Sequence, residues 1–170
     1  MSLLADMLET HYRPARVQAR RLARRPEERN LLALLALVCL VTFLTRLPFL
    51  VETQASAVEP LEARVAAMLI ATMLFGPLFL YAVAALSHLV ALALGGQGGW
   101  FQARLALIWT LFAFQPLVVV SVILGRLGGP GQPSVVIGLG LLVWFMTAWI
   151  IGLWHHERPL GGVAHAEKQE

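Results

Sequence analysis

The chain has 170 residues, enough for one domain, and 58% of them are hydrophobic while only 14% are charged. One core of this size cannot bury so much apolar surface, which excludes a water-soluble globular domain and makes lipid the expected solvent. The formal net charge is +3, and the only cysteine is Cys39. A disulfide or a cysteine-based metal site within one chain is therefore excluded.

Residues 1–30 form a basic arm before the first long apolar stretch. Apolar residues recur at helical spacing from Leu3 to Tyr12, Pro14 ends the run, and a second short helix is expected from Ala15 to Arg25. Such a composition is typical of a segment in the headgroup layer of an anionic membrane, and a solvated tail that only sets the topology is the alternative. The arginines expected to contact lipid headgroups here are Arg13, Arg16, Arg20, Arg21, Arg24, Arg25 and Arg29.

Four apolar stretches follow, and each reaches the ~20 residues that cross a ~30 Å hydrocarbon layer. They cover residues 31–51, 65–94, 103–124 and 134–154, which predicts an all-α polytopic membrane protein with about four transmembrane helices. The second stretch is longer than one upright crossing needs. We expect it to tilt or to bend at Gly76-Pro77, and a re-entrant pair of short helices stays an alternative.

The placement of arginine predicts the side of the membrane on which each end lies. Seven arginines precede the first stretch, whereas the loop 52–64 carries three glutamates and one arginine. Segments rich in Arg and Lys stay in the cytoplasm, and an even number of crossings returns the tail, residues 155–170, to the same side. We do not expect a secretory signal, because the first apolar run exceeds the ~7–15 residues of a signal core.

Three of the polar side chains inside the apolar stretches, His88, Gln115 and Arg46, are candidates for a particular role. His88 is a candidate for a proton relay, a ligand contact or a haem ligand, but a ring bonded to a neighbouring helix is the simpler interpretation because no second buried acid or histidine accompanies it. Gln115, beside Pro116, is expected to bond another helix or the carbonyl that the proline frees. Arg46 is interpreted as an interfacial anchor that extends toward the glutamates of the loop 52–64.

Other patterns indicate packing and depth in the membrane. Small residues at four-residue spacing, such as Ala148 and Gly152, permit close helix contact. Tryptophans and Tyr81 suit interface depths. The tail histidines are His155, His156 and His165, but adjacent imidazoles point in different directions, so we expect no metal site. No phosphate loop, nucleophile elbow or paired membrane carboxylates are present, so we expect no catalytic residue, no cofactor and no nucleic-acid partner.

Residues 86–116 read LSHLVALALGGQGGWFQARLALIWTLFAFQP. In this segment the chain resembles the bacterial branch of the Yip family, the Ypt/Rab-interacting integral membrane proteins. The matching positions are His88, Gly95, Gly96, Gly98, Gly99, Trp100, Phe101 and Pro116. The glycines permit a tight cytoplasmic turn, after which the aromatic pair lies at the interface and Arg104 meets lipid phosphates. The resemblance implies a place in a bacterial inner membrane and no catalytic residue, and eukaryotic relatives bind Rab-type GTPases.

These patterns favour a non-enzymatic membrane scaffold or adaptor of the Yip type. Its expected partners are anionic lipid headgroups and another integral membrane protein or complex. One alternative is an accessory subunit of a larger respiratory, photosynthetic or transport complex. Another is a small transporter or channel in which His88, Tyr81 and Gln115 form a polar path.

Overall fold

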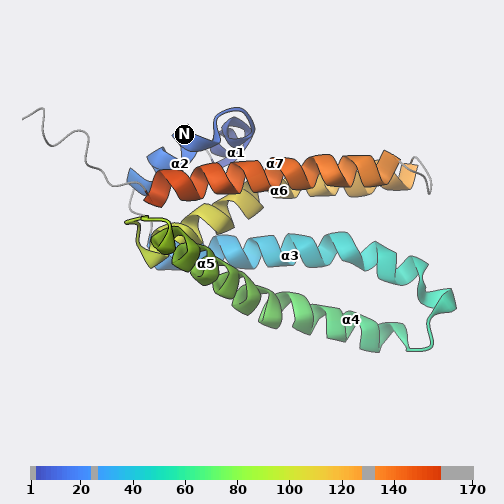
Figure 1. The fold of residues 1–170 in the computed structure, drawn as a ribbon. Helices are drawn as coiled ribbons and strands as arrows, with labels where there is room; N and C mark the ends of the chain where they lie inside the picture. The colour runs from blue at the N-terminus through green and yellow to red at the C-terminus, as the bar shows by residue number, and fades with distance from the viewer. Residues whose placement is uncertain (1–2, 24–26, 128–132, 158–170) are drawn as a thin grey trace, which may run out of the picture.

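The computed structural model describes residues 3–23, 27–127 and 133–157, and helices dominate them (Figure 1). The elements in chain order are α1 (Leu3–Tyr12), α2 (Pro14–Ala23), α3 (Glu28–Glu52), the short turn η1 (Gln54–Ser56), α4 (Leu61–Ile70), η2 (Ala71–Phe75), α5 (Gly76–Ala93), α6 (Trp100–Leu127) and α7 (Pro133–Glu157). The described part contains no strand, so the expected all-α class is confirmed.

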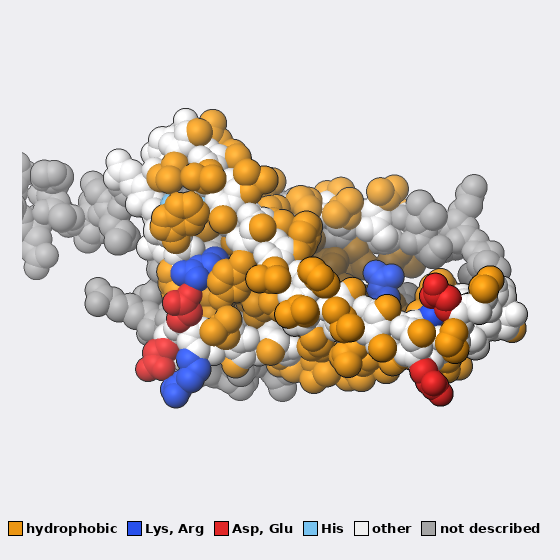
Figure 2. Space-filling model, turned by 90° about the horizontal axis from the view of Figure 1, so that it is seen from below, with side chains coloured by type: hydrophobic (Ala, Val, Ile, Leu, Met, Phe, Trp, Pro, Cys, Tyr) orange, Lys and Arg blue, Asp and Glu red, His pale blue; other side chains and the backbone are white. Residues whose placement is uncertain are grey.

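Four helical stretches in the described residues are long and apolar enough to cross a membrane, namely Glu28–Glu52, Leu61–Ala93, Trp100–Gly125 and Val136–Trp154. Large apolar side chains on α4, α5 and α7 are exposed, as a lipid-facing surface requires. In Figure 2 hydrophobic side chains cover the middle of one face, and most charged side chains lie toward its two ends. This distribution matches an apolar layer bounded by polar ones.

The second crossing is one continuous helical run, Leu61–Ala93, and not a re-entrant pair. Its irregularity lies where Gly76-Pro77 predicted it. The turn η2 is a π-helix in which the Gly76 N–H donates to Ala71 O, five residues back. Pro77 has no N–H and cannot donate a hydrogen bond to the preceding turn. A π-helical turn at this point therefore adds little further loss of backbone hydrogen bonding. A Cβ on Gly76 would lie 3.6 Å from the Cys39 sulfur, which shows that α3 and the second crossing approach closely at this point.

The glycine turn between α5 and α6 has a Schellman geometry. Gly95 has a φ of +88°, and the N–H groups of Gly95 and Gly96 donate to Leu92 O at 3.0 Å and Ala91 O at 2.8 Å. Only glycine adopts that φ at little cost. α6 then begins with a cap in which the Gly99 N–H donates to Gln102 Oε1 at 3.0 Å. The expected tight turn is thus built from both helix ends.

The N-terminal half of α6 lies at the centre of the molecule. Every residue from Leu105 to Thr110 is buried, because α6 contacts α3 and α5 on one side and α1, α2 and α7 on the other. Farther along, Gln115 Nε2 donates to Thr42 Oγ1 at 3.1 Å and to Val38 O at 3.3 Å on α3. The expected bond from Gln115 to another helix is therefore present.

The basic arm folds back on the helix bundle. α1 and α2 pack against α6 and α7, and Figure 1 shows α1 nearly end-on, crossing the direction in which those two helices run. The sequence of the arm, with apolar residues at helical spacing up to Tyr12 and a break at Pro14, predicted two short helices, and both are present. It did not predict that they would cover the surface of two membrane-crossing helices.

Candidate functional site: a polar junction between the arm and α6

Asp6 on α1 is the centre of a buried polar cluster. Its side chain is fully buried, and its two carboxylate oxygens accept hydrogen bonds from Arg20 at 2.7 Å and Arg21 at 3.1 Å. Arg20 also donates to Glu9 at 2.6 Å. Pro14 at the start of α2 ends α1, and the chain turns there, so that the acidic side chains of α1 meet the basic ones of α2.

We call this cluster and its contacts on α6 the polar junction, which comprises Asp6, Glu9, Thr10, Gln18, Arg20, Arg21, Trp109 and Thr110. The hydrogen bond to Glu9, together with the charges of Asp6 and Glu9, raises the pKa of Arg20 above its ordinary value, although burial opposes the shift. A raised pKa means that the Arg20 guanidinium keeps its proton below that pKa and loses it only as the pH rises through it. Arg20 therefore stays charged at any physiological pH.

Trp109 joins the arm to α6. The Arg21 guanidinium carbon lies 3.4 Å from the centroid of the Trp109 ring, which is a cation–π contact. The indole Nε1–H donates to Thr10 Oγ1 at 3.1 Å, and Thr10 Oγ1 donates to Asp6 O at 2.7 Å. The sequence grouped Trp109 with aromatic residues at interface depths. The structure places it fully buried, because the arm covers it.

Gln18 makes the second connection, to both α6 and α7. Its Nε2 donates to Thr110 Oγ1 at 3.2 Å and to Ala106 O at 3.4 Å. A Cβ on Gly152 would lie 2.9 Å from that nitrogen. The small residues Ala148 and Gly152 are both buried, so the small-residue spacing on α7 does serve close contact, and Gly152 is where α2 approaches.

The residues of the glycine-turn motif form a separate cluster at the α5–α6 turn. His88 is buried, with its ring edge-on to Trp100 at a centroid distance of 4.6 Å. Arg104 pairs with Glu28 on α3 and lies 5.3 Å from the Tyr81 ring centroid. The structure thus brings His88, Trp100 and Arg104 to one end of the bundle, while Pro116 lies farther along α6.

The expected lipid-contacting arginines differ in their surroundings. Arg13 and Arg16 are exposed, and Arg29 pairs with Glu27 at 3.1 Å. Arg20 and Arg21 belong to the polar junction, and Arg24 and Arg25 lie outside the described residues. Headgroup contact by this set and by Arg104 stays a prediction.

Two further sets of predicted residues are placed as follows. Arg46 is exposed, and within the described residues it pairs with neither Glu52 nor Glu59. Interfacial anchoring by Arg46 stays a prediction. His165 lies outside the described residues, as do the side chains of His155 and His156. In the part of the chain that is described, no group of three or more His, Cys, Asp or Glu side chains forms a metal-binding cluster.

The polar junction is the functional feature that the sequence did not reveal. It holds no nucleophile beside a base. Its contacts hold the helices together through ion pairs, one cation–π contact and hydrogen bonds from amide and hydroxyl groups. The available signal was the pair of carboxylates Asp6 and Glu9 in the first short helix of the arm, just before the arginines of the second. Buried charges require partners, so these two had to be matched by arginines nearby.

Four apolar crossings, a helical arm and a capped glycine turn define a polytopic α-helical membrane protein. A family model described as the Yip1 domain matches residues 11–161, which include α2 and all four crossings, so the chain belongs to the Yip family. The resemblance seen in residues 86–116 is therefore confirmed. Comparison with curated proteins and with solved structures gives no match. Most of α1, including Asp6, precedes the matched residues.

Proposed function

We propose that the protein is a non-enzymatic scaffold or adaptor in a bacterial cytoplasmic (inner) membrane. The observation that carries this proposal is membership of the Yip family, whose members are membrane proteins not known as enzymes. The described buried polar groups are consistent with it, because Asp6, Gln18 and Gln115 bond neighbouring helices. Side chains used in this way hold helices together and leave no free catalytic set.

The arrangement of the ends supports a cytoplasmic position for both. The four crossings alternate in direction, so the start of α3 and the end of α7 lie at the same end of the bundle (Figure 1). Seven arginines precede α3 in the chain, and segments rich in arginine are retained in the cytoplasm. The exposed Arg13 and Arg16 are then available to anionic headgroups, which attract basic side chains by about 1 kcal/mol each near the surface.

A second integral membrane protein is the proposed partner. The test is purification from native membranes with a tag on the C-terminal tail, followed by cross-linking and mass spectrometry. We expect a stable protein or lipid partner to be recovered with the chain. Recovery as a lone monomer with neither would overturn the scaffold proposal, and a stoichiometric large respiratory, photosynthetic or transport complex would favour the accessory-subunit alternative.

The transporter alternative receives less support from the geometry. Gln115 bonds α3 at Thr42, whereas Tyr81 lies near Arg104 at the turn between α5 and α6. Each polar group therefore has a local partner. A flux in proteoliposomes that His88→Ala abolishes, while helical content stays unchanged, would reverse this preference.

A further inference from the structure

We propose that α1 and α2 form a wedge inside one leaflet of the membrane, the leaflet on the N-terminal side, and that the protein therefore favours membranes curved so that this leaflet is convex. The inference deepens the proposed lipid contact, because it places the arm among acyl chains and not only on the headgroups. It concerns lipid as the partner of the outward face of the arm.

The contacts of α1 fix its depth. Thr10 bonds Trp109, which comes nine residues after Trp100 at the start of the third crossing. His11 stacks on Trp144 at a centroid distance of 4.7 Å, ten residues before Trp154 at the end of the fourth. At ~1.5 Å per residue both contacts lie ~13–15 Å from the ends of these spans, and one leaflet of hydrocarbon is about 15 Å thick. Because the third crossing, Trp100–Gly125, has 26 residues and is therefore ~39 Å long, up to ~9 Å of it extends beyond a ~30 Å layer, which places α1 ~5–15 Å into the hydrocarbon of one leaflet.

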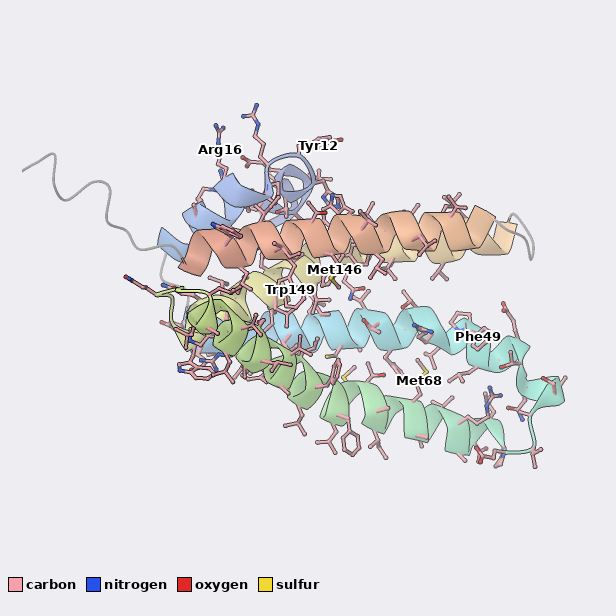
Figure 3. All side chains as sticks on the ribbon, in the orientation of Figure 1. Tyr12, Arg16, Phe49, Met68, Met146 and Trp149 are labelled. Carbon is pink, nitrogen blue, oxygen red and sulfur yellow. The ribbon has the colours of Figure 1, made fainter. Side chains whose placement is uncertain are left out.

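The two faces of α1 are arranged for lipid and not for water. Asp6 and Thr10 are fully buried, whereas Leu8 is 67% and Tyr12 87% exposed. In water the order would be reversed, with the carboxylate outside and leucine inside. Tyr12 and Arg16 point away from the bundle (Figure 3).

Among the described residues, the arm has no counterpart in the other leaflet. Toward the N-terminal end of α7, Val136 is 69% and Leu139 58% exposed, and among the described residues α1 and α2 lie only at the opposite end of α6 and α7 (Figure 1). In the half of the bundle that holds the N-terminal end of α7, α4 diverges from α7. This divergence leaves space between the helices that lipid can fill, but it adds no further helix to that leaflet. The protein therefore occupies more area in the leaflet that holds the arm, which is the shape of a wedge.

Depth is tested with the full chain in vesicles of phosphatidylcholine and phosphatidylglycerol. In a Cys39→Ala background, Leu8→Cys carries a spin label on the outward face of α1, and Val58→Cys carries the reference label in the loop between α3 and α4. Val58 is fully exposed. We expect the ratio of oxygen to nickel-chelate accessibility to be several-fold higher at Leu8 than at Val58. Equal ratios would place α1 in water and overturn the proposal.

Curvature preference is tested by orientation in vesicles of decreasing diameter. Protease access to the N-terminus reports the fraction of molecules whose arm faces outward, and we expect this fraction to rise as the vesicles become smaller. Leu8→Glu, which places a charge among acyl chains without touching the polar junction, should abolish the rise, and Val58→Glu should keep it. A fraction independent of diameter for the unmodified protein, or an equal rise for Leu8→Glu, contradicts the wedge.

The two measurements remain informative if a variant is unstable. Circular dichroism and size-exclusion chromatography check that Leu8→Glu retains its helices, and the depth measurement does not use that variant. Neither assay involves a protein partner. Failure of the wedge would thus leave the scaffold proposal standing, and a failed pull-down would leave the wedge standing.

Discussion

Replacing Gly152 with alanine tests the contact between the arm and α7. The new Cβ would lie 2.9 Å from Gln18 Nε2 and 3.2 Å from its Cδ. The Gln18 amide must therefore move away from Thr110, whose Oγ1 it now contacts at 3.2 Å. The same substitution at Gly140, on the same helix, meets nothing within 4 Å, which makes Gly140→Ala a matched control.

The expected difference follows from three terms. Alanine in place of glycine within a helix stabilises it by roughly 0.5–1 kcal/mol, and Gly140→Ala should show that gain. At Gly152 the same gain is offset by the loss of an interhelical hydrogen bond, on average ~0.6 and at most ~1.7 kcal/mol in membranes. Forcing Gln18 off its rotamer costs ~0.5–1.5 kcal/mol. Gly152→Ala should thus be roughly 1–3 kcal/mol less stable than Gly140→Ala.

The assay is reversible unfolding in mixed micelles, with both substitutions made in the unmodified chain and in Gln18→Ala. Without the glutamine side chain the obstacle at Gly152 disappears, so Gly152→Ala should then become stabilising, as Gly140→Ala is. If Gly152→Ala costs the same in both backgrounds, the clash lies elsewhere and the assigned contact is wrong. If Gly152→Ala changes the free energy of unfolding of the unmodified chain as Gly140→Ala does, α2 makes no close contact with α7 at Gly152.

Three further predictions concern the turn, the α3–α6 contact and the polar junction. Gly95→Ala should lose ~1–2 kcal/mol of unfolding free energy, because its φ of +88° is left-handed; an unchanged stability would exclude that geometry. A double-mutant cycle of Gln115→Leu and Thr42→Val should give a coupling near ~0.6 kcal/mol, and zero coupling would mean that the bond is absent. Trp109→Phe keeps a ring under Arg21 but removes the indole donor, so it should lose ~1 kcal/mol in thermal unfolding; no loss would show that the indole N–H is satisfied by other means.

Features governed by local rules were predictable from the sequence. Membrane crossings follow from the length and composition of apolar runs, so four were expected and four are present. Proline removes a backbone donor at a fixed place, and the irregular turn η2 accordingly precedes Gly76-Pro77. Consecutive glycines indicated a tight turn, although the sequence alone did not show which of them, Gly95, adopts the left-handed conformation.

The position of the arm was not predictable, because it depends on contacts between distant residues. Trp109 and Thr10 are 99 positions apart in the chain, and no periodic pattern connects them. A run of arginines indicates anionic lipid by composition alone, whereas the carboxylates that pair with two of them can be recognised as partners only once α1 and α2 are folded against each other. The burial of Trp109 follows from that same folding step.

The pairing of Arg20 and Arg21 with Asp6 means that the uncompensated positive charge of the arm is larger before α1 and α2 fold together than afterwards. Before α1 and α2 meet, Asp6 compensates none of the seven arginines that precede the first crossing, so all seven are available for the predicted retention on the cytoplasmic side. After folding, two of them are compensated internally, and Arg13, Arg16 and Arg29 are the arm arginines that the described structure leaves exposed, with Arg29 paired to the exposed Glu27. Removing a charge at position 20 or 21 and removing one at position 13 or 16 should therefore affect different stages, the former assembly of the arm and the latter its hold on the bilayer.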